Sequence, residues 1–220
     1  MRKTLFAEGE YYHIFNRGVD KRVIFQDSDD FNRFLLSLTE FNSVEPIGSI
    51  YEHSFKKKSQ LGNSVSKSVE KTKKPLVEMV AYCLNKNHFH LILKQVVEGG
   101  VSTFMHRLGL GFTKYFNEKN KRSGSLFQGP FKAVHITSNE QLIYVGAYVN
   151  LNNIVHGYKR TNEFRSSWDE YISNSNGMCH KGILLGQFST IKKFKRIAED
   201  TIRQIVARRH SKELEEIILE

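Results

Sequence analysis

The sequence predicts an α+β fold, in which helices pack on a central antiparallel sheet. Aromatic and β-branched runs alternate with segments whose apolar residues recur at helical spacing. Asn85-Lys86-Asn87 joins two of the strand-like runs and is a good turn sequence for an antiparallel hairpin. This order of strands and helices fits an antiparallel sheet that carries its helices on one face.

The first third of the chain contains one clear strand and one clear helix. Tyr11 to Phe15 predicts a strand, and a polar turn follows it. Residues 27–41 have apolar side chains three and four apart, which predicts an amphipathic helix. We expect a second strand over 47–55. Residues 56–74 are rich in Lys and Ser and lack aromatic residues, so we expect a flexible insertion there.

The rest of the chain predicts three further strands, two further helices and a long terminal helix. Ser138 and Gln141, like Thr137 and Glu140, have the spacing of a capping box at the start of a helix over 139–152. The chain then divides into a main domain, 1–160, and a mainly helical extension, 161–220. The other predicted segments are strands over 76–84, 88–94 and 131–136, and helices over 101–117 and from about 190 onward.

Composition favours a partner with dense negative charge. The 220 residues include 33 Lys and Arg against 23 Asp and Glu, which gives a net charge of +10. Nucleic acid or an anionic membrane surface would suit this charge. No apolar run reaches the ~18 residues that a membrane span needs, and residues 1–12 have no secretory pattern, so we expect a cytoplasmic protein. Cys83 and Cys179 lack metal-ligand spacing and are expected to be reduced and structural.

Two pairs of residues carry candidate chemistry. Strand alternation puts His88 and His90 on one face, which is half of a metal site or else a pair of surface or core histidines. Tyr148 and Asn152 lie four apart on the predicted helix and would share a face. Over the histidines, Asn152 can supply an oxygen ligand and Tyr148 a hydroxyl. The alternative is an amphipathic helix with a core tyrosine.

Four segments together resemble a known family. They are YYHIFNRGVDKRVIF at 11–25, NHFHLIL at 87–93, SGSLFQGPFKAV at 123–134 and YVNLNNIVHG at 148–157. In this order they resemble the HUH single-tyrosine transposases, the insertion-sequence-200 type superfamily that includes the REP-associated tyrosine transposases. The resemblance covers about residues 8–160, and a weaker resemblance continues in the later segments SSWDEYI and LLGQF.

The resemblance implies a ferredoxin-like HUH sandwich and a definite chemistry. His88, His90 and Asn152 would be the metal ligands, for Mg²⁺ or Mn²⁺. Tyr148 would be the nucleophile, with Tyr144 as its rival. The protein would nick single-stranded or hairpin DNA through a 5′-phosphotyrosine intermediate and transfer the strand, and it would be associated with the nucleoid. Lys86 and Asn153 stand where the family often has proline, and neither is a catalytic group. The resemblance leaves a monomer or a homodimer open.

A set of basic and aromatic side chains is expected to contact DNA. As a group they can form the charged groove and stacking platform that single strands favour, although each charge alone is more often a solvated one. The basic run 192–209 either holds DNA or packs on the main domain. The candidate DNA contacts are Arg17, Lys21, Arg22, Arg107, Lys114, Arg122, Phe127, Phe131 and Lys132.

Two rival functions stay open at this point. A two-histidine phosphoesterase would pair His88 and His90 with the second motif His135-Ile136-Thr137, and Tyr148 would be dispensable. A DNA-binding protein that recognises hairpins without cutting would bind DNA unchanged after loss of His88.

Overall fold

A computed structural model describes residues 4–48, 50, 74–160 and 162–218. Its centre is a sheet of order β4-β1-β3-β2-β5 in which all neighbouring strands are antiparallel. The strands are β1 (Tyr11–Arg17), β2 (Val77–Asn85), β3 (His88–Gln95), β4 (Lys132–Ile136) and β5 (Phe164–Ser166). The α+β class and the antiparallel sheet predicted from the sequence are therefore confirmed.

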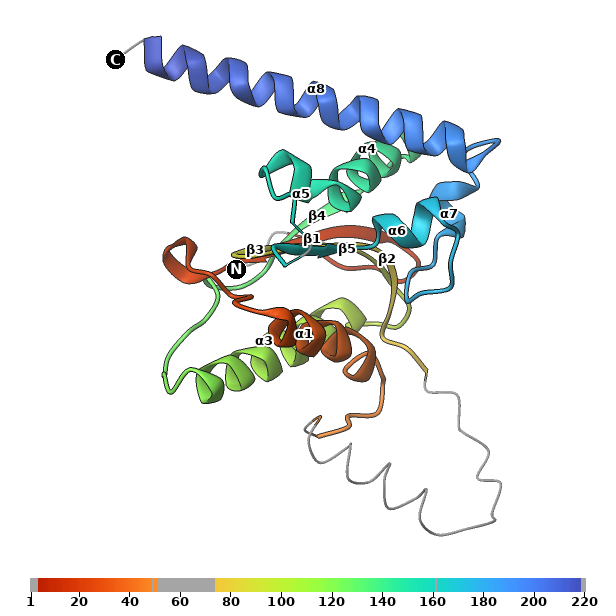
Figure 1. The fold of residues 1–220 in the computed structure, drawn as a ribbon. Helices are drawn as coiled ribbons and strands as arrows, with labels where there is room; N and C mark the ends of the chain where they lie inside the picture. Colours follow the sequence, from red (N-terminus) through yellow and green to blue (C-terminus); the bar gives the residue numbers. More distant parts are fainter. Residues whose placement is uncertain (1–3, 49, 51–73, 161, 219–220) are drawn as a thin grey trace.

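Helices cover both faces of this sheet. The order β1-α1-β2-β3-α3-β4 is ferredoxin-like, and α1 (Ser28–Glu40) and α3 (Gly100–Lys119) lie together on one face. Figure 1 shows α4 (Asn139–Asn150), α5 (Asn152–Val155) and α8 (Ile191–Ile218) on the other. The expectation of helices on one face was wrong. Because β2 and β3 are buried along nearly their whole length, both sides of the sheet need a cover.

Strand alternation sorts the β3 side chains between the two layers. Phe89 packs edge-on against Phe127 and contacts Phe34 of α1, with ring centroids 5.7 and 5.2 Å apart. His88 and His90 point the opposite way, toward α4 and α5. The histidine pair therefore belongs to the second layer, which α8 completes by packing on α4 and α5.

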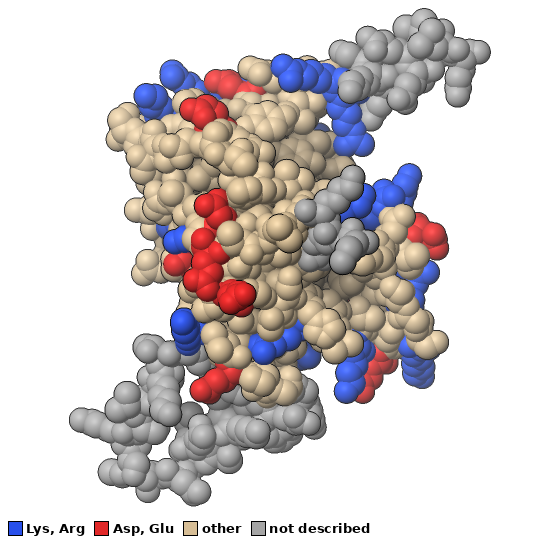
Figure 2. Space-filling model, turned by 180° about the vertical axis from the view of Figure 1, so that it is seen from behind, with Lys and Arg blue, Asp and Glu red and all other residues tan. Residues whose placement is uncertain are grey.

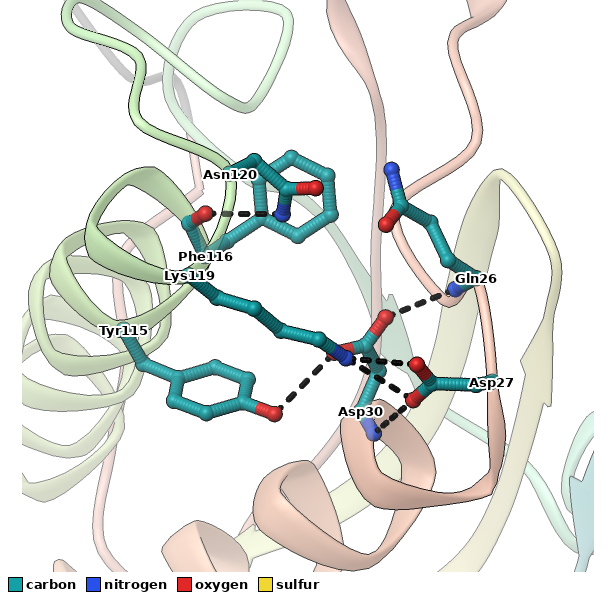
Figure 3. A network of polar contacts seen from close by, with 7 residues as sticks. All are labelled: Gln26, Asp27, Asp30, Tyr115, Phe116, Lys119 and Asn120. Carbon is teal, nitrogen blue, oxygen red and sulfur yellow. Dashed lines mark hydrogen bonds and ion pairs between the residues drawn. The ribbon is translucent and has the colours of Figure 1, made fainter.

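A charged network joins α1 to the C-terminal end of α3. Asp27 caps α1 by accepting the backbone N–H of Asp30 at 3.1 Å. The Lys119 ammonium donates to Asp27 and, at 2.7 Å, to the fully buried Asp30 (Figure 3). The Tyr115 hydroxyl donates to the same Asp30 carboxylate at 3.1 Å. These contacts fix how the two helices lie under the sheet.

The predicted helix 139–152 is two helices. Ser138 caps α4 by accepting the Gln141 N–H, as the sequence predicted. The helix ends at Asn150, and α5 starts at Asn152 after one residue, Leu151, with non-helical dihedral angles. Tyr148 and Asn152 consequently belong to different helices. The predicted strand 47–55 falls mainly outside the described residues, as does the predicted flexible insertion 56–74 apart from Lys74.

Residues after 160 join the same sheet and core. The strand β5 pairs with β2, and α6 (Trp168–Ile172) and α7 (Gly182–Leu185) lead to α8. Tyr171 is fully buried and donates its hydroxyl to the Val80 carbonyl at 2.7 Å. Phe194, at the start of α8, packs its ring against Trp168, Tyr171 and Phe188. In the described part of the chain, none of the helices has the length and hydropathy that crossing a bilayer requires.

Candidate catalytic site

The register of β1 against β3 brings two histidines into contact. Phe15 of β1 lies opposite His90 of β3, and alternation therefore turns His13 toward the same face. His13 Nε2 and His90 Nδ1 are 2.9 Å apart, in hydrogen-bond contact, and the two rings stack with centroids 5.1 Å apart. Burial lowers the pKa of His13 to about 4 and holds that of His90 well below its ordinary value. Both imidazoles are therefore neutral near pH 7.

His88 meets a pair of buried amides. Its Nε2 lies 3.0 Å from Asn152 Oδ1 and 3.0 Å from Asn85 Nδ2. Asn85 Nδ2 also donates to Asn152 Oδ1 at 2.8 Å, which fixes the direction of that carbonyl oxygen. Asn85 is the residue opposite His88 in the β2–β3 hairpin, so the strand register sets this contact as well.

A neutral His88 has too few N–H groups to donate to both of the oxygens that lie next to its ring. Its Nδ1 lies 2.6 Å from Asn87 Oδ1, and both Asn87 Oδ1 and Asn152 Oδ1 are acceptors. Burial lowers the pKa of His88, and a neutral imidazole carries one N–H. When Nδ1–H donates to Asn87, the Nε2 lone pair accepts from Asn85 Nδ2, and no hydrogen lies between Nε2 and the Asn152 oxygen. The Nε2 and Oδ1 atoms, two acceptors 3.0 Å apart, suit a shared cation in place of the Asn85 N–H groups.

The donor set fits a divalent metal with an amide as third ligand. Within the described ranges, no three His, Cys, Asp or Glu side chains are placed to share a metal ion. The Asn152 carbonyl oxygen is the further donor beside His88, while its Nδ2 is buried without a hydrogen-bond partner. Imidazole nitrogen with amide oxygen suits Mn²⁺ or Mg²⁺, and imidazole also admits later transition metals.

The Tyr148 ring packs against the histidines of the candidate site. From α4 its ring meets the rings of His90 and His13 edge-on, with centroids 5.4 and 6.0 Å apart. Burial raises the pKa of Tyr148, while Asn152 and the charge of Arg209 act in the opposite direction. The rival nucleophile, Tyr144, lies one turn earlier with 47% of its surface exposed, and it has no ring contact with the histidines.

A polar cavity of about 610 Å³ opens beside the histidines. Basic side chains from three separate parts of the chain line it, and His88 and His90 lie in its wall. A cavity with positive charge and a metal-type donor set can take a phosphodiester. Its lining is Phe15, Asn16, Arg17, Lys21, Asn87, His88, His90, Gln128, Lys132, His156, Tyr158 and Arg209.

The structure brings together three of the predicted DNA contacts. Arg17, Lys21 and Lys132 all line the cavity, and Arg17 is also hydrogen-bonded to Gln128. Arg107 and Lys114 lie on α3, on the opposite face of the sheet. Arg107 there donates to the Ser43 and Val44 carbonyls, at 2.5 and 3.4 Å, and holds a loop.

The other predicted contacts serve local structure. Arg22 donates to the Val19 carbonyl, and Arg122 donates to the Asn117 side chain and the Ser125 carbonyl. Phe127 is 8% exposed and packs on Phe89 in the core, so it presents no open ring to a base. On the face shown in Figure 2, Lys and Arg lie mainly toward the edges, and Asp and Glu form a vertical group nearer the middle.

Three residues beside the candidate site were not predicted from the sequence: His13, which contacts His90, and His156 and Arg209, which line the cavity. His13 lies within the predicted strand YYHIF, two residues before Phe15 and therefore on the same face. Strand alternation in this segment could have indicated His13 as a site residue. His156 and Arg209 carry no local pattern, because α5 and α8 reach the cavity only through tertiary packing. The His156 and His88 rings have centroids 4.4 Å apart.

The second histidine motif lies away from the site. His135 is opposite Tyr12 in the β1–β4 register and stacks on its ring, so it shares the face of Tyr12 and not that of His13. Its Nε2 is 2.8 Å from a Glu10 carboxylate oxygen. A two-histidine phosphoesterase that pairs His135 with His88 and His90 is therefore wrong, because strand alternation separates them.

Comparison with known proteins agrees with this geometry. Residues 50–152 match the family described as "Transposase IS200 like". No curated protein matches the chain. A solved structure of a REP-associated tyrosine transposase bound to a REP hairpin has a similar fold, with a TM-score of 0.50 and 12% sequence identity over 79% of this chain and 85% of that one. The family match and the shared fold both support the resemblance to the HUH single-tyrosine transposases that the sequence shows.

Proposed function

We propose that this chain is a metal-dependent DNA nickase and strand-transferase, with Tyr148 as its nucleophile. The observation that carries the proposal is the position of Tyr148, whose ring lies against His90 within the layer that also holds His88 and Asn152. A nucleophile, a donor set for a cation and a basic cavity thus meet in one place.

The reaction needs no water and no nucleotide cofactor. The Tyr148 hydroxyl oxygen attacks the phosphorus, the P–O3′ bond breaks, and the phosphate stays on the enzyme as a 5′-phosphotyrosine. The hydroxyl proton leaves the tyrosine, and the departing O3′ takes up a proton to become a free 3′-hydroxyl. Attack by a 3′-hydroxyl on the phosphotyrosine then reverses the step and joins a new strand.

The chain's own groups prepare this step. His88, His90 and Asn152 would hold a divalent cation, Mg²⁺ or Mn²⁺, which supplies charge neutralisation at the scissile phosphate when it is bound. The burial of Tyr148 raises its pKa, so deprotonation requires a neighbouring positive charge. Arg17, Lys21 and Lys132 would hold the DNA backbone along the cavity.

Single-stranded or hairpin DNA is the proposed partner. The solved structure of similar fold contains a REP hairpin, and the net charge of +10 suits a polyanion. A single strand has a flexible backbone with exposed phosphates, so its scissile phosphate can enter the cavity beside His88 and His90.

Covalent trapping tests the proposal. The full chain is incubated with labelled hairpin DNA from the flanks of its own gene and Mn²⁺ or Mg²⁺, and products are separated on a denaturing protein gel. We expect a labelled protein adduct that Tyr148→Phe abolishes and Tyr144→Phe keeps. Cleavage without an adduct would indicate a water-using phosphoesterase. Binding without cleavage, unchanged in His88→Ala, would indicate a hairpin-binding protein that does not cut.

A further inference from the structure

A buried side-chain contact joins the last turn of α4 to the chain beyond β5. Asn150 is the final residue of α4 and Ser167 directly follows β5, and both are fully buried. The Ser167 hydroxyl donates to Asn150 Oδ1 at 2.7 Å, and Asn150 Nδ2 donates to the Gly146 carbonyl at 2.9 Å. A buried amide that is bonded at both ends holds its helix in one orientation.

The backbone of β2 fixes this serine. Ser167 Oγ accepts the N–H of Tyr82 at 2.9 Å, and the Ser167 N–H donates to the Tyr82 carbonyl at 3.0 Å. The hydroxyl has one hydrogen, and Asn150 Oδ1 at 2.7 Å is nearer to Oγ than the Tyr82 carbonyl at 3.2 Å. Tyr82 immediately precedes Cys83, the residue opposite His90. The end of α4 is therefore bonded to the strand pair that carries the histidines.

A second contact from the chain after residue 160 lies one turn earlier on α4. Gly146 packs so closely on Leu184 of α7 that a Cβ at this position would lie 2.8 Å from both leucine methyl carbons. Gly146 and Asn150 are four apart and share one side of the helix, whereas Tyr148 lies about 200° around the helix from each of them. Contacts that fix this side of α4 therefore also fix the direction in which Tyr148 points.

The residues before and after the break between α4 and α5 are held by different bonds. Asn150 is bonded to Ser167, whereas Asn152, the proposed metal ligand, accepts from Asn85 at 2.8 Å. The serine thus acts on the helix that carries Tyr148, and Asn85 acts on the helix that carries Asn152. The nucleophile and the donor set can consequently be disturbed separately.

We propose that Asn150 and Ser167 are positioning residues, which hold α4 so that the Tyr148 hydroxyl meets the scissile phosphate in line. This inference rests on the proposed function. In-line attack requires the reacting atoms to lie about 3–3.5 Å apart, and a misplacement of about 1 Å can cost roughly 100-fold in rate. Neither side chain lines the cavity, so both act on the reaction through the helix.

Asn150→Ala tests the contact. After this substitution the Ser167 hydroxyl can donate to the Tyr82 carbonyl, 3.2 Å away, so it keeps an acceptor in the core. At saturating DNA and Mn²⁺, we expect the rate of adduct formation to fall roughly 10- to 100-fold in Asn150→Ala and to change less than about 2-fold in Asn42→Ala. Asn42 is the matched control, because its side-chain amide bonds to the backbone at the start of β2, away from the cavity.

A loosened fold would not give this pattern. The affinity for a labelled single strand, measured in a Tyr148→Phe background, and the affinity for Mn²⁺ should both stay within about 2-fold of their values without Asn150→Ala, because the bond that orients Asn152 is unchanged. Ser167→Ala should lower the rate to a similar extent. The double variant should be no slower than the slower single variant, since all three remove the same contact.

Fluorine NMR follows the position of Tyr148 independently of cleavage. In a chain that carries fluorotyrosine, the Tyr148 signal is assigned by its absence in Tyr148→Phe. The ring lies edge-on to those of His90 and His13, so a small displacement alters the ring-current shift. We expect the signal to move or broaden in Asn150→Ala and to stay unchanged in Asn42→Ala.

The outcomes are distinct. Equal adduct rates in Asn150→Ala and the wild type would overturn the positioning role and leave Tyr148 as nucleophile. A loss of DNA or Mn²⁺ affinity as large as the loss of rate would also overturn it, since the substitution would then have disturbed the whole site. A wild type that forms no adduct would overturn the proposed function instead. An unmoved Tyr148 signal in Asn150→Ala would overturn the positioning role whether or not the wild type cuts.

Discussion

Asn85 Nδ2 donates to Asn152 Oδ1 at 2.8 Å, and this bond aims the amide oxygen of α5 at His88. Asn85 is itself fully buried at the end of β2. A side chain that orients a metal ligand without binding the metal is a common support in such sites. The pair therefore links the sheet to the short helix that completes the donor set.

Replacing Asn85 should weaken metal binding although Asn85 is not a ligand. We expect Asn85→Ala to reduce Mn²⁺ affinity about 10- to 100-fold, because the Asn152 oxygen loses its orienting bond. Calorimetric titration with Mn²⁺ measures this directly. Asn42→Ala is the comparison, since the Asn42 side-chain amide also bonds to the backbone, at Leu76 and Val77, but on the loop after α1. Equal Mn²⁺ affinity in the wild type and Asn85→Ala would contradict the arrangement.

Lys132 and Lys114 should differ in DNA binding. Both are exposed lysines in the candidate set, but Lys132 lines the catalytic cavity and Lys114 lies on α3 beyond the sheet. We expect Lys132→Ala to reduce the salt slope of single-strand binding by about 0.7, as for one lost phosphate contact, and Lys114→Ala to leave it unchanged. Fluorescence anisotropy over a salt series measures both. A larger effect from Lys114 would place the DNA on the other face.

Lys119 should contribute to stability in a pH-dependent way. Lys119→Met leaves the buried Asp30 carboxylate without its cation, so we expect a loss of about 2–4 kcal/mol in the free energy of unfolding at pH 7. Hydrogen bonding to Lys119 lowers the pKa of Asp27. A carboxyl with a lowered pKa stabilises the fold above its unfolded pKa of about 3.9 and loses this contribution as pH falls through the folded value.

The difference between wild type and Lys119→Met should accordingly be full above about pH 5 and shrink in acid. Denaturant unfolding at a series of pH values follows it. Lys114→Met, an exposed position on the same helix, serves as the control. A constant difference down to pH 2 would show that the carboxylates do not depend on Lys119.

Phe194 should couple the terminal helix to the whole domain. Its ring is 1% exposed and packs on Trp168, Tyr171 and Phe188, so Phe194→Ala should cost about 3–5 kcal/mol. Thermal unfolding followed by circular dichroism checks this, with Leu5→Ala, at 88% exposed, as a neutral comparison. Two separate transitions in the variant, with the main one unmoved, would mean that residues after 160 unfold independently.

Local patterns were enough to predict most of the sheet and part of the arrangement of the candidate site. Alternation in NHFHLIL predicted the shared face of His88 and His90, and capping chemistry predicted the start of α4 at Ser138. The break at Leu151 was missed, because apolar spacing continues through it and only the dihedral angles change. Asn152 nevertheless meets His88, since α5 packs on β2.

The features that could not be predicted from the sequence depend on tertiary contacts. The three residues of β5 are too few for a pattern, and they become a strand only by pairing with β2. Arg107 and Phe127 looked suited to DNA by residue type, but one holds a loop and the other fills the core. Arg209 was not among the predicted contacts although it lines the cavity, because the sequence of a basic helix does not indicate which of its charges lies beside the site.

The β2–β3 hairpin also determines which genetic lesions this protein tolerates. Asn85, His88 and His90 share one face only because the pairing Asn85↔His88 and Cys83↔His90 keeps their parity. The loss of the Phe89 codon, between the two histidines, would keep the reading frame and nearly all of the protein, yet it would turn the residues on one side of the deletion to the opposite face. Copies of such a gene would then be expected to lose activity while every side chain of the proposed catalytic site remained encoded.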